Sequence, residues 1–398
     1  LSLLFFAILN CNLLAQSEGI TRSQNRPMLD SHFRERVSEM NRWIHPRLSF
    51  QVEYDDNIFF EPTNEKDDFI FTVSPGFLLD VPFSGDTHLF TLDYHADLAA
   101  FVDYGDQNFD NHFLLTNLDL NFTNFFIKTY DDFRKTSLRA STEFTERIER
   151  FENLYSIDLG SKDWNKLSAV GGYDYFIIRY REDAFDVFDR DEHMLNLTGY
   201  YQLRPKTKAL LEYNHAFINY DVAARDGDYD QVRTGIQGEI FNKLIATAKI
   251  GYQNRRYDDS DQDWSNAVVS LGLDHYFSSA TSLSLSYERS ARESVYKTNN
   301  FYALDLVSAT LRQKLFFERL DGKIGFSYQN NNYDSATTEG AVTQERDDDI
   351  LSFNVGADYA IQDWLLTGVE YTYVDRDSNF SEFDYTDNRV LWKISALF

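Results

Sequence analysis

Apolar residues recur at every second position of this chain from Leu48 onward, and this period of two constrains the fold more than any other feature. One segment reads, in order, Val269, Ser270, Leu271, Gly272, Leu273 and Asp274. Because successive side chains of a strand point to opposite faces of a sheet, we expect strands with one apolar and one polar face. Apolar residues at helical spacing are nearly absent beyond residue 47, so the sequence predicts an all-β fold.

The connections between these segments alternate in length. Short links fall near Ser84, Thr123, Lys162, Pro205, Asn242, Ser278, Asp321 and Gln362. Long acidic links fall near 55–68, 104–112, 131–152, 181–192, 221–230, 255–263, 289–300, 329–349 and 374–388. This alternation predicts about eighteen strands, joined as hairpins, in a single closed antiparallel transmembrane β-barrel. Short periplasmic turns and long acidic extracellular loops are typical of such a barrel.

A soluble β-sandwich is the alternative, because its strands also alternate. Regular alternation of loop length is not expected of a sandwich. The segments here also reach about the 9–11 residues with which a tilted strand crosses a bilayer. The longest apolar run, Leu3–Leu9, is far shorter than the roughly 18 residues of a spanning helix. The sequence therefore favours the barrel.

Residues 1–15 resemble a secretory signal peptide that is cut after Ala15. The chain starts with Leu1 rather than Met, so we expect its start to be truncated. Cys11 is the single cysteine, and it is either removed with this peptide or lipidated. Asn10 before it is larger than lipidation motifs prefer, which favours removal.

Residues 16–46 are expected to form a periplasmic lead-in to a barrel of residues 47–398. Helical spacing is confined to this lead-in, at Leu29, Phe33, Val37, Met40 and Ile44. It predicts a short amphipathic helix. A plain lead-in is the favoured interpretation, and a small plug or a docking site for a periplasmic partner is the alternative.

The end of the chain alternates up to a C-terminal aromatic residue. The alternating residues are Val390, Trp392, Ile394, Ala396 and Phe398. They resemble the terminal strand that outer-membrane proteins present to the barrel-assembly machinery. We therefore expect that machinery as a partner and the outer membrane as the location.

The first strands carry motif-like residues. They are Tyr54-Asp55-Asp56-Asn57-Ile58-Phe59, Asn64-Glu65, Asp68-Phe69-Ile70 and Ser74-Pro75-Gly76. They resemble the opening of the outer-membrane β-barrel porins of the "porin 2" type of Gram-negative bacteria, and the resemblance covers about 47–398. It implies an outer-membrane barrel without catalytic residues, of a kind sometimes linked to exopolysaccharide export. Pro75 cannot donate to a ladder, so we expect a β-bulge there.

The chain is strongly acidic, with 38 Lys and Arg against 64 Asp and Glu and a formal net charge of −26. This charge excludes a general nucleic-acid binder, because phosphate partners need a basic surface. Most of the acid lies in the long connections. There it either keeps the surface solvated or binds divalent cations that bridge to anionic glycolipid, so outer-membrane lipid and lipopolysaccharide are expected partners.

The polar strand face is expected to line the lumen. The candidates are Asp93, His95, Asp97, Asp119, Asp274, Glu288, Asp358, Glu370, Lys249 and Lys393. In an open lumen such acids favour cations. In the alternative, these charges pair with one another or with loops folded inward, and nothing is conducted.

We expect no enzymatic activity and no cofactor or metal. Asp93, His95 and Asp97 share one face, and a barrel hydrolase could use them with a serine, but no nucleophile can be assigned. The sequence thus predicts a porin-like barrel that passes cations and neutral solutes or serves exopolysaccharide export, the latter with export components as partners. The alternatives are a non-conducting structural or adhesive barrel that binds glycan or cations and, less favoured, a barrel hydrolase.

Overall fold

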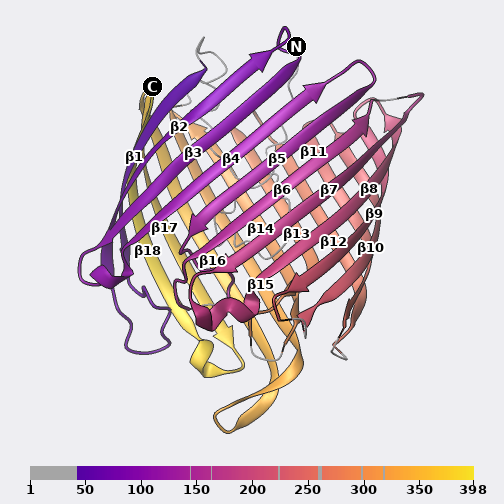
Figure 1. Ribbon diagram of the computed structural model, residues 1–398. Helices are drawn as coiled ribbons and strands as arrows, with labels where there is room; N and C mark the ends of the chain where they lie inside the picture. Colours follow the sequence, from indigo (N-terminus) through magenta and orange to yellow (C-terminus); the bar gives the residue numbers. More distant parts are fainter. Residues whose placement is uncertain are drawn as a thin grey trace.

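The computed structural model describes residues 43–398 apart from 144, 163, 223–224, 259–261, 297–298 and 317–318. These residues form eighteen strands in one antiparallel sheet that is rolled into a barrel (Figure 1). The strands are β1 (Ile44–Asp55), β2 (Asp68–Phe83), β3 (His88–Phe101), β4 (Phe109–Asn121), β5 (Phe125–Thr136), β6 (Arg150–Ser161), β7 (Leu167–Tyr180), β8 (Arg190–Arg204), β9 (Thr207–Tyr220), β10 (Gly227–Phe241), β11 (Leu244–Tyr257), β12 (Trp264–Tyr276), β13 (Thr281–Glu293), β14 (Phe301–Leu315), β15 (Leu320–Glu339), β16 (Val342–Gln362), β17 (Leu365–Ser378) and β18 (Tyr385–Leu397). The long connections include the 3₁₀ helices η1 (Gly105–Gln107), η2 (Asp183–Phe188) and η4 (Ser381–Phe383).

The signal peptide, Cys11 and nearly all of the lead-in lie outside the described residues, so the expectations about them stay predictions. The first strand begins at Ile44, three residues before the expected start of the barrel. Within the described part of the chain, no helix is long and apolar enough to span a membrane.

Pairing of β1 with β18 closes the barrel. It runs from Arg47 opposite Leu397 to Asp55 opposite Arg389. Every other strand pairs with its two neighbours in the chain. A closed sheet leaves no strand edge unpaired, which is the condition for strands in hydrocarbon. The predicted closed barrel of eighteen strands is confirmed.

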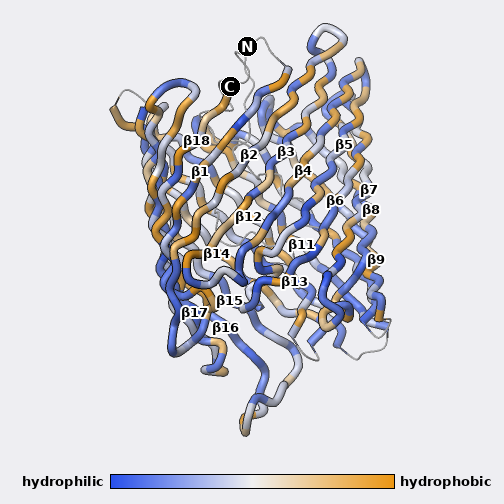
Figure 2. Tube along the Cα trace, turned by 60° about the vertical axis from the view of Figure 1, so that its left-hand side comes forward, coloured by the Kyte–Doolittle hydropathy of each residue, from blue (hydrophilic) through white to orange (hydrophobic). Residues whose placement is uncertain are grey.

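Alternating residues separate into an apolar outer face and a polar inner face, and apolar and polar positions alternate along the strands in Figure 2. On β3, Leu98 is 46% exposed, whereas Asp93 on the other face is 3% exposed. Val390, Trp392 and Phe398 of the C-terminal segment are likewise exposed. Large exposed apolar side chains on this scale suit lipid rather than water. The role of the C-terminal residues as an assembly signal stays a prediction.

Strands extend further into the long connections than predicted. β15 and β16 remain paired up to Glu339 opposite Val342, so most of the expected loop at 329–349 is strand. This ribbon projects from the end of the barrel that carries the long connections, called the outer end below (Figure 1). Both faces of the ribbon are largely polar, so its sequence lacks the alternation of apolar and polar residues that predicted the other strands. The short link expected near Asp321 falls a few residues earlier, because β14 ends at Leu315 and β15 begins at Leu320.

Pro75 does not produce the expected β-bulge. β2 keeps its register with β1 through Pro75, which lies opposite Leu48. On the other side, pairing with β3 stops after Val73 and resumes at Gly76 without a change of register. The missing N–H therefore interrupts one ladder only, while β1 carries the strand past this point.

Phenylalanines of the long connections pack inside the barrel rather than on its lipid face. Phe185 and Phe188 contact the buried cluster that contains Phe176, and Phe383 contacts Tyr296. At the outer margin of the apolar face, tyrosines donate hydrogen bonds to acids of the neighbouring strand. These pairs are Tyr175 with Asp191, Tyr213 with Asp230, Tyr287 with Asp305 and Tyr328 with Asp349.

The connection between β1 and β2 holds β18 at the outer end of the closing seam. The buried amide of Asn57 donates to the carbonyl oxygens of Glu61 and Thr386, each at 2.9 Å. Asp56 accepts hydrogen bonds from the backbone N–H and the side-chain amide of Asn388 at 2.6 and 2.8 Å. These motif-like residues therefore extend the β1–β18 pairing beyond the last backbone pair.

Replacing Asn57 by alanine (N57A) should lower the free energy of unfolding by about 1–3 kcal/mol, because two carbonyl groups lose a buried partner. Urea unfolding of the barrel from lipid vesicles measures this loss. Thr63→Ala, at an exposed position in the same connection, is the matched control and should change stability by no more than about 0.5 kcal/mol. Equal losses in both variants would contradict the role of Asn57 in the seam.

Candidate functional site

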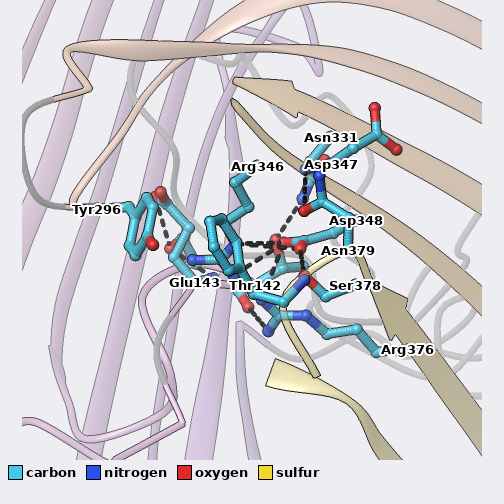
Figure 3. A network of polar contacts seen from close by, with 12 residues as sticks. Thr142, Glu143, Tyr296, Asn331, Arg346, Asp347, Asp348, Arg376, Ser378 and Asn379 are labelled. Carbon is cyan, nitrogen blue, oxygen red and sulfur yellow. Dashed lines mark hydrogen bonds and ion pairs between the residues drawn. The ribbon is translucent and has the colours of Figure 1, made fainter. Parts of the chain in front are cut away.

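Residues 137–143 and 145–149, between β5 and β6, fold into the barrel, and we call them the inward segment. The hydroxyl of Thr142 accepts a hydrogen bond from Asn331 of β15 at 2.9 Å. Its carbonyl oxygen accepts one from Arg376 of β17 at 2.7 Å. These partners are 189 and 234 residues away in sequence and belong to another part of the wall (Figure 3).

Two further contacts fix the inward segment to neighbouring connections. Glu143 accepts hydrogen bonds from the hydroxyl of Ser294 at 2.6 Å and from the backbone N–H of Val295 at 2.9 Å. Arg139 donates to the carbonyl oxygen of Ile58 at 2.8 Å. The segment therefore touches the β1–β2 connection, the β13–β14 connection and the wall at β15 and β17, and so bridges the interior.

The anchor on the wall is a buried charge network. Asp348 lies 2.8 Å from the guanidinium of Arg346 and 2.9 Å from that of Arg376. Ser378 donates to the same carboxylate at 2.6 Å. The guanidinium of Arg346 stacks on the ring of Phe383, 3.9 Å from its centroid. Each of the three charged side chains is at most 1% exposed, so they hold one another in place away from water.

Two guanidinium groups face one carboxylate in this network. The inward segment contributes a second carboxylate, Glu143, whose charge attracts Arg346. Because a buried charge without a partner is costly, the wall favours the inward position of the segment. Burial lowers the pKa of Arg139 on the same segment to about 9, which leaves it charged at neutral pH.

Pairs of arginine and acid two residues apart recur at the outer end of the inner face. They are Asp132 with Arg134, Arg150 with Glu152, Arg190 with Glu192, Arg346 with Asp348 and Asp387 with Arg389. Residues two apart on a strand share a face, so this spacing places both charges inside. The sequence-based prediction missed these pairs. In three of the five, the residue between the two charges is polar (Asp191, Asp347 or Asn388), so no contrast between apolar and polar positions marks the strand faces there.

Three of the ten candidate lumen residues lie together on β3. Asp93 forms an ion pair with Arg47 of β1. Arg47 also donates to Nδ1 of His95 at 2.8 Å. Asp97 accepts a hydrogen bond from the hydroxyl of Ser74 at 2.6 Å. The strand therefore presents partnered groups to the interior.

The remaining candidates also lie on the inner face and have partners. They are Asp119 with Lys128 (3.8 Å), Lys249 with Glu212 (2.7 Å), Glu370 with Lys323 (2.6 Å), Asp358 with Lys393 (3.0 Å), Glu288 with Arg292, and Asp274 with Ser284. The structure thus brings them together in separate pairs rather than in one ring of carboxylates. Partners such as Lys128 and Lys323 were missed, because they lie on other strands, one and two strands away respectively, and only the register aligns them.

The hydrolase alternative needs a serine beside His95. In the described residues, the hydrogen bond of His95 is to Arg47, and its ring stacks on Phe113 at 4.7 Å between centroids. The nearby hydroxyl of Ser74 is bonded to Asp97 instead. This part of the inner face therefore contains no arrangement of serine, histidine and acid.

The sequence of this closed barrel matches a known family. The family described as "Putative beta-barrel porin 2" matches residues 43–397. The chain belongs to this family. The match spans the whole barrel and places the protein in the outer membrane, as the resemblance of the first strands predicted. No curated protein matches the sequence.

Solved structures of outer-membrane proteins are similar to this barrel. The crystal structure of Pseudomonas aeruginosa OccK2 (OpdF) in complex with glucuronate has a TM-score of 0.50 and 11% identity, and the alignment covers 89% of this chain and 98% of that chain. The outer membrane protein opdK of Pseudomonas aeruginosa has a TM-score of 0.49 and 12% identity, with 89% and 99% covered. Acinetobacter baumannii OccAB3 has a TM-score of 0.48 and 14% identity, with 89% and 99% covered. At 11% identity, the likeness to OccK2 (OpdF) concerns the fold alone.

Replacing Asp348 by asparagine (D348N) should lower the free energy of unfolding by about 3–5 kcal/mol, because two buried guanidinium groups lose their shared carboxylate. Urea unfolding from lipid vesicles measures the change. Asp347→Asn, one residue away on the opposite strand face, removes the same charge and should cost at most about 1 kcal/mol. A loss in D348N no larger than in this control would show that the network does not anchor the wall.

Proposed function

We propose that this barrel is a passive outer-membrane channel for small polar solutes, narrowed at its outer end by the inward segment. The bridging of the interior by this segment carries the proposal. A barrel of this strand number is wide enough for an aqueous channel. A segment held across such an interior limits the size of the solutes that pass.

The inner face supports passage of polar rather than apolar solutes. Its charged side chains form pairs that reach across an intervening strand, such as Glu370 of β17 with Lys323 of β15 and Asp358 of β16 with Lys393 of β18. Such pairs offer hydrogen-bond donors and acceptors along the wall with little net charge. Neutral polar solutes therefore meet groups that can replace part of their hydration.

We also propose a weak preference for cations. Asp97 and Asp274 accept hydrogen bonds from the neutral hydroxyl groups of Ser74 and Ser284. A serine orients a carboxylate without cancelling its charge. These acids therefore leave a local negative potential, which favours cations as rings of acids do, although more weakly.

Export of exopolysaccharide, with export components as partners, requires a wider passage through the interior than the inward segment leaves. A polymer needs the inward segment to leave its position, which means breaking its contacts with Arg376 and Ser294. These contacts favour small solutes over a polymer. A non-conducting structural or adhesive barrel is the outcome if the segment and the aromatic side chains around it seal the outer end.

Purified protein in a planar bilayer should show steady single-channel steps. Replacing residues 140–146 by a short Gly-Ser linker should increase their conductance, because the bridge across the interior is removed. Replacing the exposed residues 340–343 at the tip of the β15–β16 ribbon by Gly and Ser is the control, since the ribbon projects away from the barrel (Figure 1). Heat-dependent migration in gels verifies folding. Silence from folded wild-type protein would overturn the channel proposal.

The reversal potential in a salt gradient tests the cation preference. Asp274→Asn should reduce the preference, because it removes a carboxylate whose hydrogen bond comes from a neutral hydroxyl. Asp86→Asn, at an exposed position in the β2–β3 turn, changes the net charge equally and should leave the reversal potential unchanged. An equal effect of both substitutions would place the source of selectivity outside the inner face.

A further inference from the structure

Three carboxylates meet at the outer end of the closing seam. Oxygen atoms of Asp55, Asp56 and Asp387 lie within 4.8 Å of one another. Asp55 ends β1, Asp56 follows it, and Asp387 belongs to β18, so the cluster joins the first and last strands of the barrel. Asp55 and Asp387 are 2% and 0% exposed, and Asp56 is the most accessible of the three.

Two of these carboxylates are held in place by hydrogen bonds. Asp55 accepts from the backbone N–H of Asn57 at 2.9 Å. Asp56 accepts from the backbone and the side chain of Asn388 at 2.6 and 2.8 Å. The cluster is therefore oriented by the seam contacts described above.

The third carboxylate is buried and lacks a hydrogen-bond donor. No N–H group or hydroxyl of the described residues donates a hydrogen bond to the carboxyl of Asp387. This carboxyl instead contacts the carboxyl of Asp55, and two acids can make such a contact only with a shared proton or a cation between them. Arg389 lies 3.0 Å from Oδ2 of Asp387, at ion-pair distance only, and one oxygen of Asp387 belongs to the cluster. A buried ionised carboxylate without a donor is costly, which indicates that a proton or a cation compensates its charge.

Basic side chains around the cluster balance only part of its charge. Arg389 lies beside Asp387, and Arg147 of the inward segment is attracted to both Asp55 and Asp387. Arg139 of the same segment is attracted to Asp55. Glu53, on the same strand face as Asp55, adds a further negative charge within reach of Arg147 and Arg389. Four acids thus face three arginines, so a small cation between the three aspartates meets an attractive potential.

We propose that Asp55, Asp56 and Asp387 bind a divalent cation, with Ca²⁺ as the favoured ion. Carboxylate oxygens are the ligands that Ca²⁺ and Mg²⁺ prefer, and Ca²⁺ tolerates irregular geometry better than Mg²⁺. The more accessible Asp56 provides the approach from the outer end, where the acidic connections concentrate cations. The bound ion ties β1 to β18 and is independent of whether the barrel conducts.

Thermal unfolding of the refolded full-length barrel in detergent, with Ca²⁺ or with EGTA, tests this site. An ion that binds only the folded state raises the midpoint temperature as its concentration increases. Ca²⁺ should raise the midpoint of the wild type, and Mg²⁺ should raise it less. Asp387→Asn should abolish the shift. Asp377→Asn, at an exposed position on neighbouring β17, is the matched control and should retain it.

Other results would overturn the proposal. Absence of a Ca²⁺ shift in the wild type would do so, and so would a shift that survives in D387N, because the ion would then bind elsewhere on the acidic surface. A midpoint that depends on pH but not on Ca²⁺ would assign the cluster to a proton shared by Asp55 and Asp387. Should D387N fail to fold, Asp56→Asn at the accessible position replaces it, and calorimetric titration of the wild type with Ca²⁺ measures binding directly.

Discussion

Backbone hydrogen bonding in a medium without water is the constraint on which the rest of this structure depends. Each strand in hydrocarbon must pair on both sides, so β1 has to meet β18. Closure in turn fixes which face of every strand looks inward. It also explains why side chains at the seam, such as Asn57, make contacts that backbone pairing alone does not provide.

The interior is organised by charge as much as by apolar packing. A buried ion pair is weak support for stability, because desolvation offsets most of the attraction. Separating its two charges inside the protein nevertheless costs more free energy than burying the pair gains, and this difference fixes the positions of the two side chains. Asp348 is shared by Arg346 and Arg376, and the latter holds the carbonyl of Thr142. The network therefore fixes the position of the inward segment but adds little to the net stability of the barrel.

Local patterns in the sequence predicted the barrel because every strand repeats the same rule. The alternation of Leu271 and Leu273 with polar neighbours is visible without any knowledge of partners. The β15–β16 ribbon escaped this rule, because a ribbon surrounded by water needs no apolar face. At Pro75 the expected bulge did not form, because the neighbouring strand carries the ladder.

The candidate site depended on contacts that no local pattern records. Asp93 and Asp97 could be placed on the inner face from alternation alone, but the ion pair with Arg47 depends on how β1 and β3 flank β2. The inward course of the segment between β5 and β6 was even harder to predict from the sequence. It rests on partners such as Arg376, more than two hundred residues away in sequence.

The closing seam also sets the order in which the molecule can be completed. Ser49 and Ser395 form a hydrogen bond across it although 346 residues separate them, whereas the other ladders join consecutive strands. Contacts of such long range form late, since the entropy of closing the loop is lost before they contribute. Before closure, the chain has seventeen ladders between consecutive strands and two strand edges, β1 and β18, without a partner. Pairing of β18, which is synthesised last, with β1 then removes both edges from contact with other chains.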